Sequence, residues 1–153
     1  MTDATIWALF LVIVQLESGG DLNARNGKAV GPAQIQPAVV LDCIKWGHAV
    51  EMRDRETLEG SFRLFRLYTD RWIAHRQIHD TPQNRANIWR HGPSSQYVLK
   101  GLSSKYSLKA ESLLKDHNLR GANPNHLKRR RPRKVASRKI FKSVNPTEQG
   151  LRG

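Results

Sequence analysis

A run of nine apolar residues, 6–14, is the feature of the sequence that most limits the possible folds. Between residues 3 and 16, apolar side chains occupy nearly every face of a helix, as they do in a helix that is buried on most sides. The run is far shorter than the roughly 20 residues that a membrane-spanning helix needs. We therefore predict a core helix over residues 3–16 and no transmembrane segment.

Four later segments also have apolar residues at the three- and four-residue steps of a helix. These predicted helices span residues 38–46, 57–77, 82–90 and 104–116. Residues 18–31 are rich in Gly and Asn, which is typical of a structured loop. No segment shows sustained alternation of apolar and polar residues, so a sheet-based fold is not expected. The sequence predicts an all-α, mainly helical domain.

The positive charge of the chain is concentrated toward its C-terminal end. The formal net charge is +13. Residues 1–115 hold 15 Lys and Arg against 11 Asp and Glu, a net of +4, whereas residues 116–153 hold 11 against 2, a net of +9. A segment with so little apolar content cannot bury enough area to offset its ordering entropy. We predict a folded domain over residues 1–118 and a flexible basic tail over residues 119–153.

The predicted tail has the charge, but not the aromatic side chains, of a nucleic-acid-binding segment. Phe141 is its only aromatic residue, so sequence-specific recognition of nucleic acid is not expected, and nucleic-acid binding is a distant alternative. We expect a weak, salt-sensitive attraction to anionic polymers of the cell envelope.

Cysteine and histidine are too sparse to suggest a disulfide or a zinc centre. Cys43 is the only cysteine, which excludes an intramolecular disulfide, and no Cys and His cluster has the spacing of a structural zinc site. We predict that Cys43 is a small buried apolar residue. No metal and no organic cofactor are expected.

Glu17 is the residue whose position in the sequence most clearly suggests a catalytic role. It follows the apolar helix directly, so its carboxyl is predicted to lie at the edge of a dry core, where desolvation favours the protonated form and suits a general acid. Gly19 and Gly20 place no side chains beside it, which is predicted to let a bulky substrate approach. An isolated E-S-G-G would more simply be a glutamate beside a glycine cap at a helix end.

Other short motifs follow Glu17 in a fixed order. They are E-S-G-G at residues 17–20, N-A at 23–24 and G-P-A-Q-I-Q-P at 31–37. In this order they resemble the lytic transglycosylase and goose-type lysozyme family, in which E-S-G-G ends an apolar helix and G-L-M-Q-I-x-P follows. Looser counterparts of the family's N-x-x-x-G-x-x-Y-L, A-Y-N-A-G-P and Y-V-x-K-V elements are residues 56–64, 88–93 and 106–110. The resemblance covers roughly residues 3–115.

The resemblance implies a lysozyme-like helical domain that cleaves the β-1,4 bond between N-acetylmuramic acid and N-acetylglucosamine in peptidoglycan. Glu17 is implied as the acid that protonates the glycosidic oxygen and then as the base that deprotonates the muramic 6-hydroxyl, which leaves a 1,6-anhydro product. Substrate-binding roles are implied for Ser18, Gln34, Ile35 and Trp89. Peptidoglycan strands are the expected partner, and we expect a monomer.

Two departures from the family pattern keep other functions open. Leu-Met becomes Pro32-Ala33, which is predicted to narrow an apolar lip of the cleft, and the tyrosine of A-Y-N-A-G becomes Trp89, which offers only an indole N–H. A catalytically weak glycan binder is therefore one alternative. Another is a lysozyme-type hydrolase of peptidoglycan or a chitin-like glycan; if it inverts, it needs a second carboxylate, for which Asp21 and Asp42 are the candidates.

The family resemblance implies action in the cell envelope, in the periplasm or the wall. The chain begins without the basic stretch of a secretory signal peptide, and Gln15 and Glu17 stand where its cleavage site would be expected. We expect a phage-encoded protein or one that is exported by another route.

Overall fold

The computed structural model describes residues 1–121 and confirms a mainly helical fold over this range. The elements are α1 (Asp3–Ser18), β1 (Arg25–Asn26), β2 (Ala29–Val30), α2 (Pro37–Lys45), the 3-10 helix η1 (Met52–Glu56), α3 (Leu58–Arg76), α4 (Pro82–His91), α5 (Gln96–Leu99) and α6 (Lys105–Gly121). Helix α6 continues past the predicted domain boundary at residue 118. The rest of the predicted basic tail lies outside the described residues.

Helix α1 forms the centre of the hydrophobic core, as its apolar run predicts. The hydroxyl of Thr2 accepts a hydrogen bond from the backbone N–H of Thr5 at the start of the helix, and Gly19 ends it in the left-handed conformation with φ 67°. Its buried residues are Ile6, Ala8, Leu9, Phe10, Val12, Ile13 and Val14. Among the residues described, no helix is long and apolar enough to cross a membrane.

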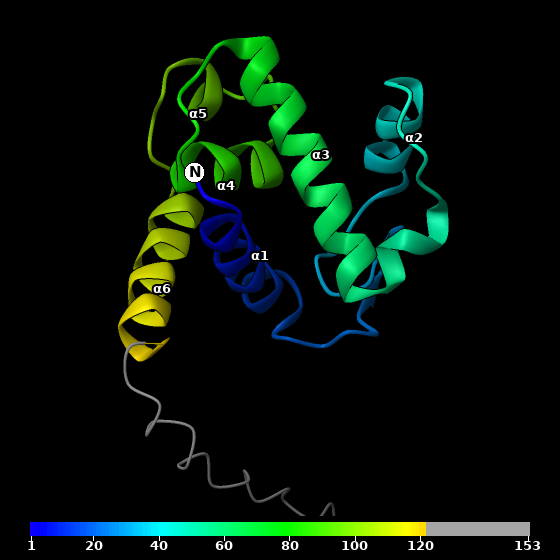
Figure 1. Ribbon diagram of the computed structural model, residues 1–153, viewed down its shortest axis with the longest axis horizontal. Coiled ribbons are helices and arrows are strands. Elements are labelled where there is room, and N and C mark those ends of the chain that lie inside the picture. Colours follow the sequence, from blue (N-terminus) through cyan, green and yellow to red (C-terminus); the bar gives the residue numbers. More distant parts are fainter. Residues whose placement is uncertain (122–153) are drawn as a thin grey trace, which may run out of the picture.

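The helices are arranged around α3, the longest of them (Figure 1). Helix α2 packs on one side of α3, while α1 and α4 pack on the other, and α6 covers α1 and α4. Phe65 of α3 and Phe10 of α1 are fully buried where these two helices meet. This arrangement brings the C-terminal ends of α1 and α4 close to the N-terminal end of α2.

Threonine and proline determine where the later helices begin. The hydroxyls of Thr57 and Thr81 accept backbone N–H groups at the starts of α3 and α4, and Pro82 occupies the first turn of α4. Gly92 then ends α4. The five long helices agree with those predicted from the apolar spacing.

The loop between α1 and α2 is held against η1. Gly31 has φ 77°, and a Cβ atom at this position would collide with the carbonyl oxygen of Arg55, so only glycine fits. The guanidinium of Arg55 donates hydrogen bonds to the carbonyl oxygens of Lys28 and Ile35, both at 3.2 Å. These contacts fasten the loop to η1.

Cys43 is fully buried in the core, as predicted. Burial, together with the negative charge of Asp42, raises the pKa of its thiol to about 11. The thiol therefore stays protonated at neutral pH and behaves as a small apolar side chain.

Candidate active site

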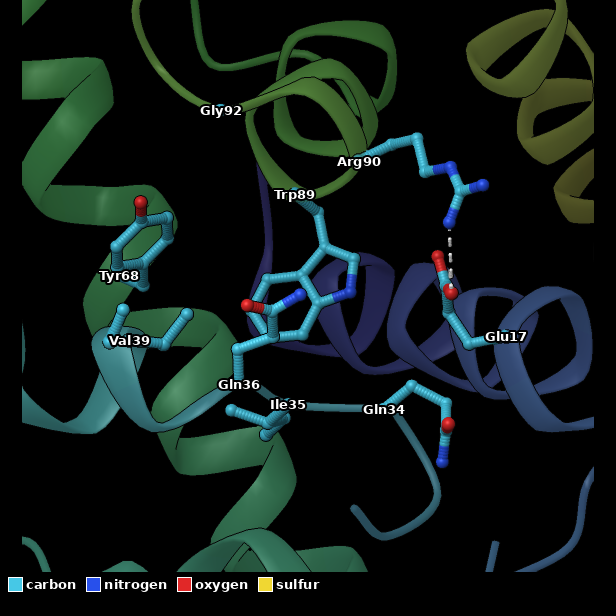
Figure 2. Close-up of a pocket in the computed structure, with 10 residues that line it drawn as sticks. Glu17, Gln34, Ile35, Gln36, Val39, Tyr68, Trp89, Arg90 and Gly92 are labelled. Atoms are coloured by element: carbon cyan, nitrogen blue, oxygen red, sulfur yellow. Dashed lines mark hydrogen bonds and ion pairs between the residues drawn. The ribbon is translucent and has the colours of Figure 1, made fainter. Parts of the chain in front are cut away.

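A groove of about 340 Å³ opens where α1, α2, α3 and α4 converge (Figure 2). Its lining residues are Glu17, Gln34, Ile35, Gln36, Ala38, Val39, Tyr68, Trp89, Arg90 and Gly92. Four of the predicted site residues, Glu17, Gln34, Ile35 and Trp89, are thus brought together, although 72 positions separate the first from the last.

Glu17 lies in the last turn of α1, and both of its carboxylate oxygens have a partner. The side chain is only 11% exposed. The hydroxyl of Tyr106 donates a hydrogen bond to Oε1 at 2.7 Å, and Nη1 of Arg90 lies 3.4 Å from Oε2. The carboxylate is therefore held at one end of the groove by groups from α6 and α4.

Tyr106 is a persistent hydrogen-bond donor to Glu17. Burial, and then the neighbouring charge of Glu17, raise the pKa of the phenol far above its ordinary value, so Tyr106 stays protonated at physiological pH. The guanidinium carbon of Arg90 also lies 5.6 Å from the centre of the Tyr106 ring, within the range of a cation–π contact. Glu17, Tyr106 and Arg90 thus form one contact cluster, which we call the acid cluster.

Tyr106 and Arg90 are absent from the predicted site. Both fall inside segments that were matched only loosely to the family, 88–93 and 106–110. Tyr106 is the tyrosine of the Y-V-x-K-V counterpart, a signal that could have pointed to it, whereas Arg90 matches no letter of its motif. Their contacts with Glu17 join positions that are 89 and 73 residues apart. Only the packing of α4 and α6 on α1 reveals them.

Trp89 provides the aromatic surface of the groove. The half-buried indole packs edge-on against Phe65 with 5.1 Å between ring centres, and against Tyr68 with 6.3 Å. Figure 2 shows the ring at the centre of the groove, between Tyr68 and Glu17. A flat apolar ring in this position suits stacking against a sugar, and the predicted substrate contact of Trp89 stays a prediction.

Gln34 and Ile35 form a wall of the groove in different ways. Gln34 has φ 50°, and its side-chain nitrogen donates hydrogen bonds to the carbonyl oxygens of Ala24 at 3.0 Å and Gly31 at 2.9 Å. The side chain of Ile35 is 1% exposed and belongs to the core. Gln34 therefore braces the loop, and Ile35 supports the wall from behind.

Pro32 and Ala33 do not narrow a lip of the groove, so this expectation was wrong. Both side chains are fully buried, and neither lines the groove. The physical reason is the backbone pairing between Val30 and Ile35, which closes a tight turn and directs Ala33 into the core.

Gly19 and Gly20 also lie outside the groove lining. A Cβ atom at Gly19 would meet nothing within 4 Å. However, the φ angles of 67° at Gly19 and 90° at Gly20 lie in a region where any residue other than glycine would be strained. These glycines are explained by the way the chain leaves α1, rather than by access to the acid.

Three further candidate residues lie outside the groove. The hydroxyl of Ser18 donates a hydrogen bond to the carbonyl oxygen of Val14 at 3.0 Å, within α1. Asp21 is exposed and accepts a hydrogen bond from the backbone N–H of Asn23 at 2.9 Å, and Asp42 lies on α2. None of them lines the groove, so Glu17 is the single carboxylate of the lining within residues 1–121.

The described residues contain no group of three or more His, Cys, Asp or Glu side chains that could hold a metal ion. His91 is exposed at the end of α4 and packs against Tyr97, with 4.5 Å between ring centres. Burial and the nearby charge of Arg90 lower its pKa.

Comparison with known proteins gives no match: no protein-family model matches the chain, and no curated protein and no solved structure matches it either.

Proposed function

We propose that this protein cleaves β-1,4 glycosidic bonds of peptidoglycan as a lytic transglycosylase, with Glu17 as the acid and then the base. One observation carries the proposal. Glu17 is the single carboxylate in a groove with a central aromatic ring, and it is largely buried and hydrogen-bonded to Tyr106. The order of the sequence motifs around Glu17 supports the same function.

The proposed reaction needs one carboxyl group and no other reagent. Protonated Glu17 donates its proton to the glycosidic oxygen as the bond to the anomeric carbon of the muramic acid breaks. The resulting carboxylate then takes the proton of the muramic 6-hydroxyl, whose oxygen attacks the anomeric carbon. A 1,6-anhydro sugar forms, and Glu17 is protonated again.

The composition of the groove favours this route over hydrolysis with inversion. An inverting glycosidase places a second carboxylate about 6.5–9.5 Å from the acid, where it activates water. The groove lining supplies no such residue, and both candidates, Asp21 and Asp42, lie outside it. An intramolecular attack by the 6-hydroxyl removes the need for a second carboxylate.

Tyr106 is proposed to position the acid. Its hydrogen bond to Oε1 restricts rotation of the Glu17 carboxyl and leaves Oε2 on the side of Arg90. Trp89 is proposed to stack on the sugar that is bound next to the acid. With peptidoglycan as the substrate, the place of action is the cell envelope.

Digestion of purified peptidoglycan tests the proposal. We expect the parent protein to release products with 1,6-anhydro ends, as measured by mass spectrometry, and Glu17→Gln to lose this activity. Glu59→Gln, which changes an exposed glutamate at the start of α3, is the matched control and is expected to stay active.

The products also separate the alternatives. Reducing ends would indicate a hydrolase, and binding of glycan without turnover by the parent would indicate a glycan-binding protein. Undiminished cleavage by Glu17→Gln would falsify the role of Glu17.

A further inference from the structure

Among the residues that the structure describes, Arg90 is the only cationic side chain that lines the groove, and most of its hydrogen-bonding capacity is unused. The side chain is 53% exposed. Its one hydrogen bond among the described residues is the 3.4 Å contact with Glu17, which is long for a charge-assisted bond. A guanidinium carries five N–H donors, so most of them have no partner among the described residues.

The ion pair between Arg90 and Glu17 is incompatible with the first step of the proposed reaction. Glu17 must carry a proton before it can donate one, and a neutral carboxyl group forms no ion pair with Arg90. The charge attraction between the two groups is therefore lost when Glu17 is protonated for catalysis. The guanidinium, which is 53% exposed, is then available to another anion, and a carboxylate on the substrate would replace the negative charge that Glu17 loses.

We propose that Arg90 binds a carboxylate carried by the substrate, and that this exchange of partners releases Glu17 for catalysis. This inference rests on the proposed function and narrows its substrate class to acidic glycans. A neutral chitin-like glycan carries no group that could take Arg90 from Glu17. On peptidoglycan, the carboxylate comes either from the lactyl ether of muramic acid or from an attached stem peptide.

The position of Arg90 fits this role. It occupies the last turn of α4, immediately after Trp89, so a sugar stacked on the indole lies next to the guanidinium. Figure 2 shows Arg90 reaching from α4 toward Glu17 on the same side of Trp89. A substituent of that sugar and the acid can therefore compete for the same guanidinium group.

The experiment compares cleavage of three polymers by the parent and by Arg90→Gln. Chitin oligomers carry no carboxylate, glycan strands stripped of peptide carry only lactyl carboxylates, and intact peptidoglycan carries only peptide carboxylates. We expect the parent to favour at least one acidic polymer, and Arg90→Gln to lower kcat/KM for that polymer about tenfold, the effect expected for loss of a charge-assisted hydrogen bond. Cleavage of chitin oligomers is expected to fall less than cleavage of that acidic polymer, because chitin carries no carboxylate for Arg90 to bind.

Two variants complete the design. Arg90→Lys keeps the positive charge and is expected to retain part of the preference for the acidic polymer over chitin oligomers. Arg53→Gln removes an exposed arginine of η1 that is paired with Glu51 at 2.8 Å, and is expected to leave the preference unchanged. The acidic polymer whose cleavage depends on Arg90 identifies the source of the carboxylate.

The inference and the proposed function fail in different ways. If Arg90→Gln lowers kcat/KM equally for all three polymers, or for none of them, the inference is overturned. In either case, cleavage of peptidoglycan by the parent protein still supports the proposed function. A parent that cleaves none of the polymers overturns the proposed function, and the inference with it.

Discussion

Helix α4 carries two arginines, Arg85 and Arg90, in very different surroundings. Arg85 is 3% exposed and contacts Asp70, Asp80 and the hydroxyl of Thr69, each at 2.6 Å. Arg90, five residues further along, is half exposed and has one long contact with Glu17.

The difference in surroundings indicates that the charge of Arg85 holds the fold together, whereas the charge of Arg90 can bind a ligand. Burial opposes the charge on Arg85, but the hydrogen bonds to Asp80 and Asp70 outweigh it and raise the pKa of the guanidinium. Arg85 thereby joins the start of α4 to α3. Arg90 has no comparable set of partners among the described residues, so its charge is available to a ligand.

Loss of Arg85 is expected to have the largest effect on stability. Arg85→Gln leaves Asp70 and Asp80 without their shared partner, and breaking a buried ion pair lowers the free energy of unfolding by about 3 kcal/mol. Chemical denaturation measures the change, with Arg90→Gln as the control on the same helix. Equal destabilisation by the two substitutions would remove the distinction between the two arginines.

Asp80 is expected to make the stability of this buried network depend on pH. Burial opposes its charge, but Arg85 and the amino group of Met1 outweigh this and lower the pKa of Asp80 below its ordinary value. The pairing therefore stabilises the folded state fully above the unfolded pKa of about 4, and this stabilisation is lost as the pH falls through the lower folded pKa.

Asp80→Asn is accordingly expected to lower the free energy of unfolding at pH 7 by about 1.5–2 kcal/mol, as for a hydrogen bond to a charged group. It is also expected to flatten the decline of stability below pH 4. Denaturation curves from pH 2 to 7 measure both effects, with the exposed Asp21→Asn as the control. An unchanged slope below pH 4 would contradict the role of Asp80.

Tyr106→Phe tests the acid cluster, to which Arg90 belongs. Loss of the 2.7 Å hydrogen bond frees the Glu17 carboxyl to rotate, so kcat is expected to fall about tenfold with little change in KM. Tyr97→Phe, which alters a tyrosine of α5 outside the groove lining, is the control. A rise in KM with kcat unchanged would mean that Tyr106 contacts the substrate rather than positioning the acid.

The sequence predicts the long helices because their apolar residues repeat with helical spacing. It does not predict η1 and α5, since elements of five and four residues are too short to show a period. The hairpin of β1 and β2 turns through Gly27 and Lys28, with Gly27 at φ 58°, but its two-residue strands are too short to show alternation.

The candidate site is predictable only where its residues belong to local motifs. Glu17, Gln34 and Trp89 come from such motifs and meet in the groove. Tyr106 also belongs to a local motif, the Y-V-x-K-V counterpart, but its contact with Glu17, like that of Arg90, depends on the packing of distant helices, which no local pattern records. Asp21 is close to Glu17 in sequence, but the left-handed turn after α1 leaves it outside the groove.

The smallest expected effect is that of Arg90→Ala on stability, and it tests the comparison most sharply. The ion pair with Glu17 is long, and Arg90 is half exposed, so solvent screens its charge and the pair contributes little to folding. We expect the free energy of unfolding to change by less than about 0.5 kcal/mol. Thermal and urea denaturation at pH 7 measure this change against the parent.

A loss of 2 kcal/mol or more, on the scale expected for a buried pair, would show that Arg90 is a structural residue like Arg85. In that case the guanidinium is not available to a ligand, and a change in substrate preference would follow from a disturbed groove. A small change in stability together with an altered preference for acidic glycan places the effect in binding. The two measurements together therefore decide whether the charge of Arg90 serves substrate binding or the fold.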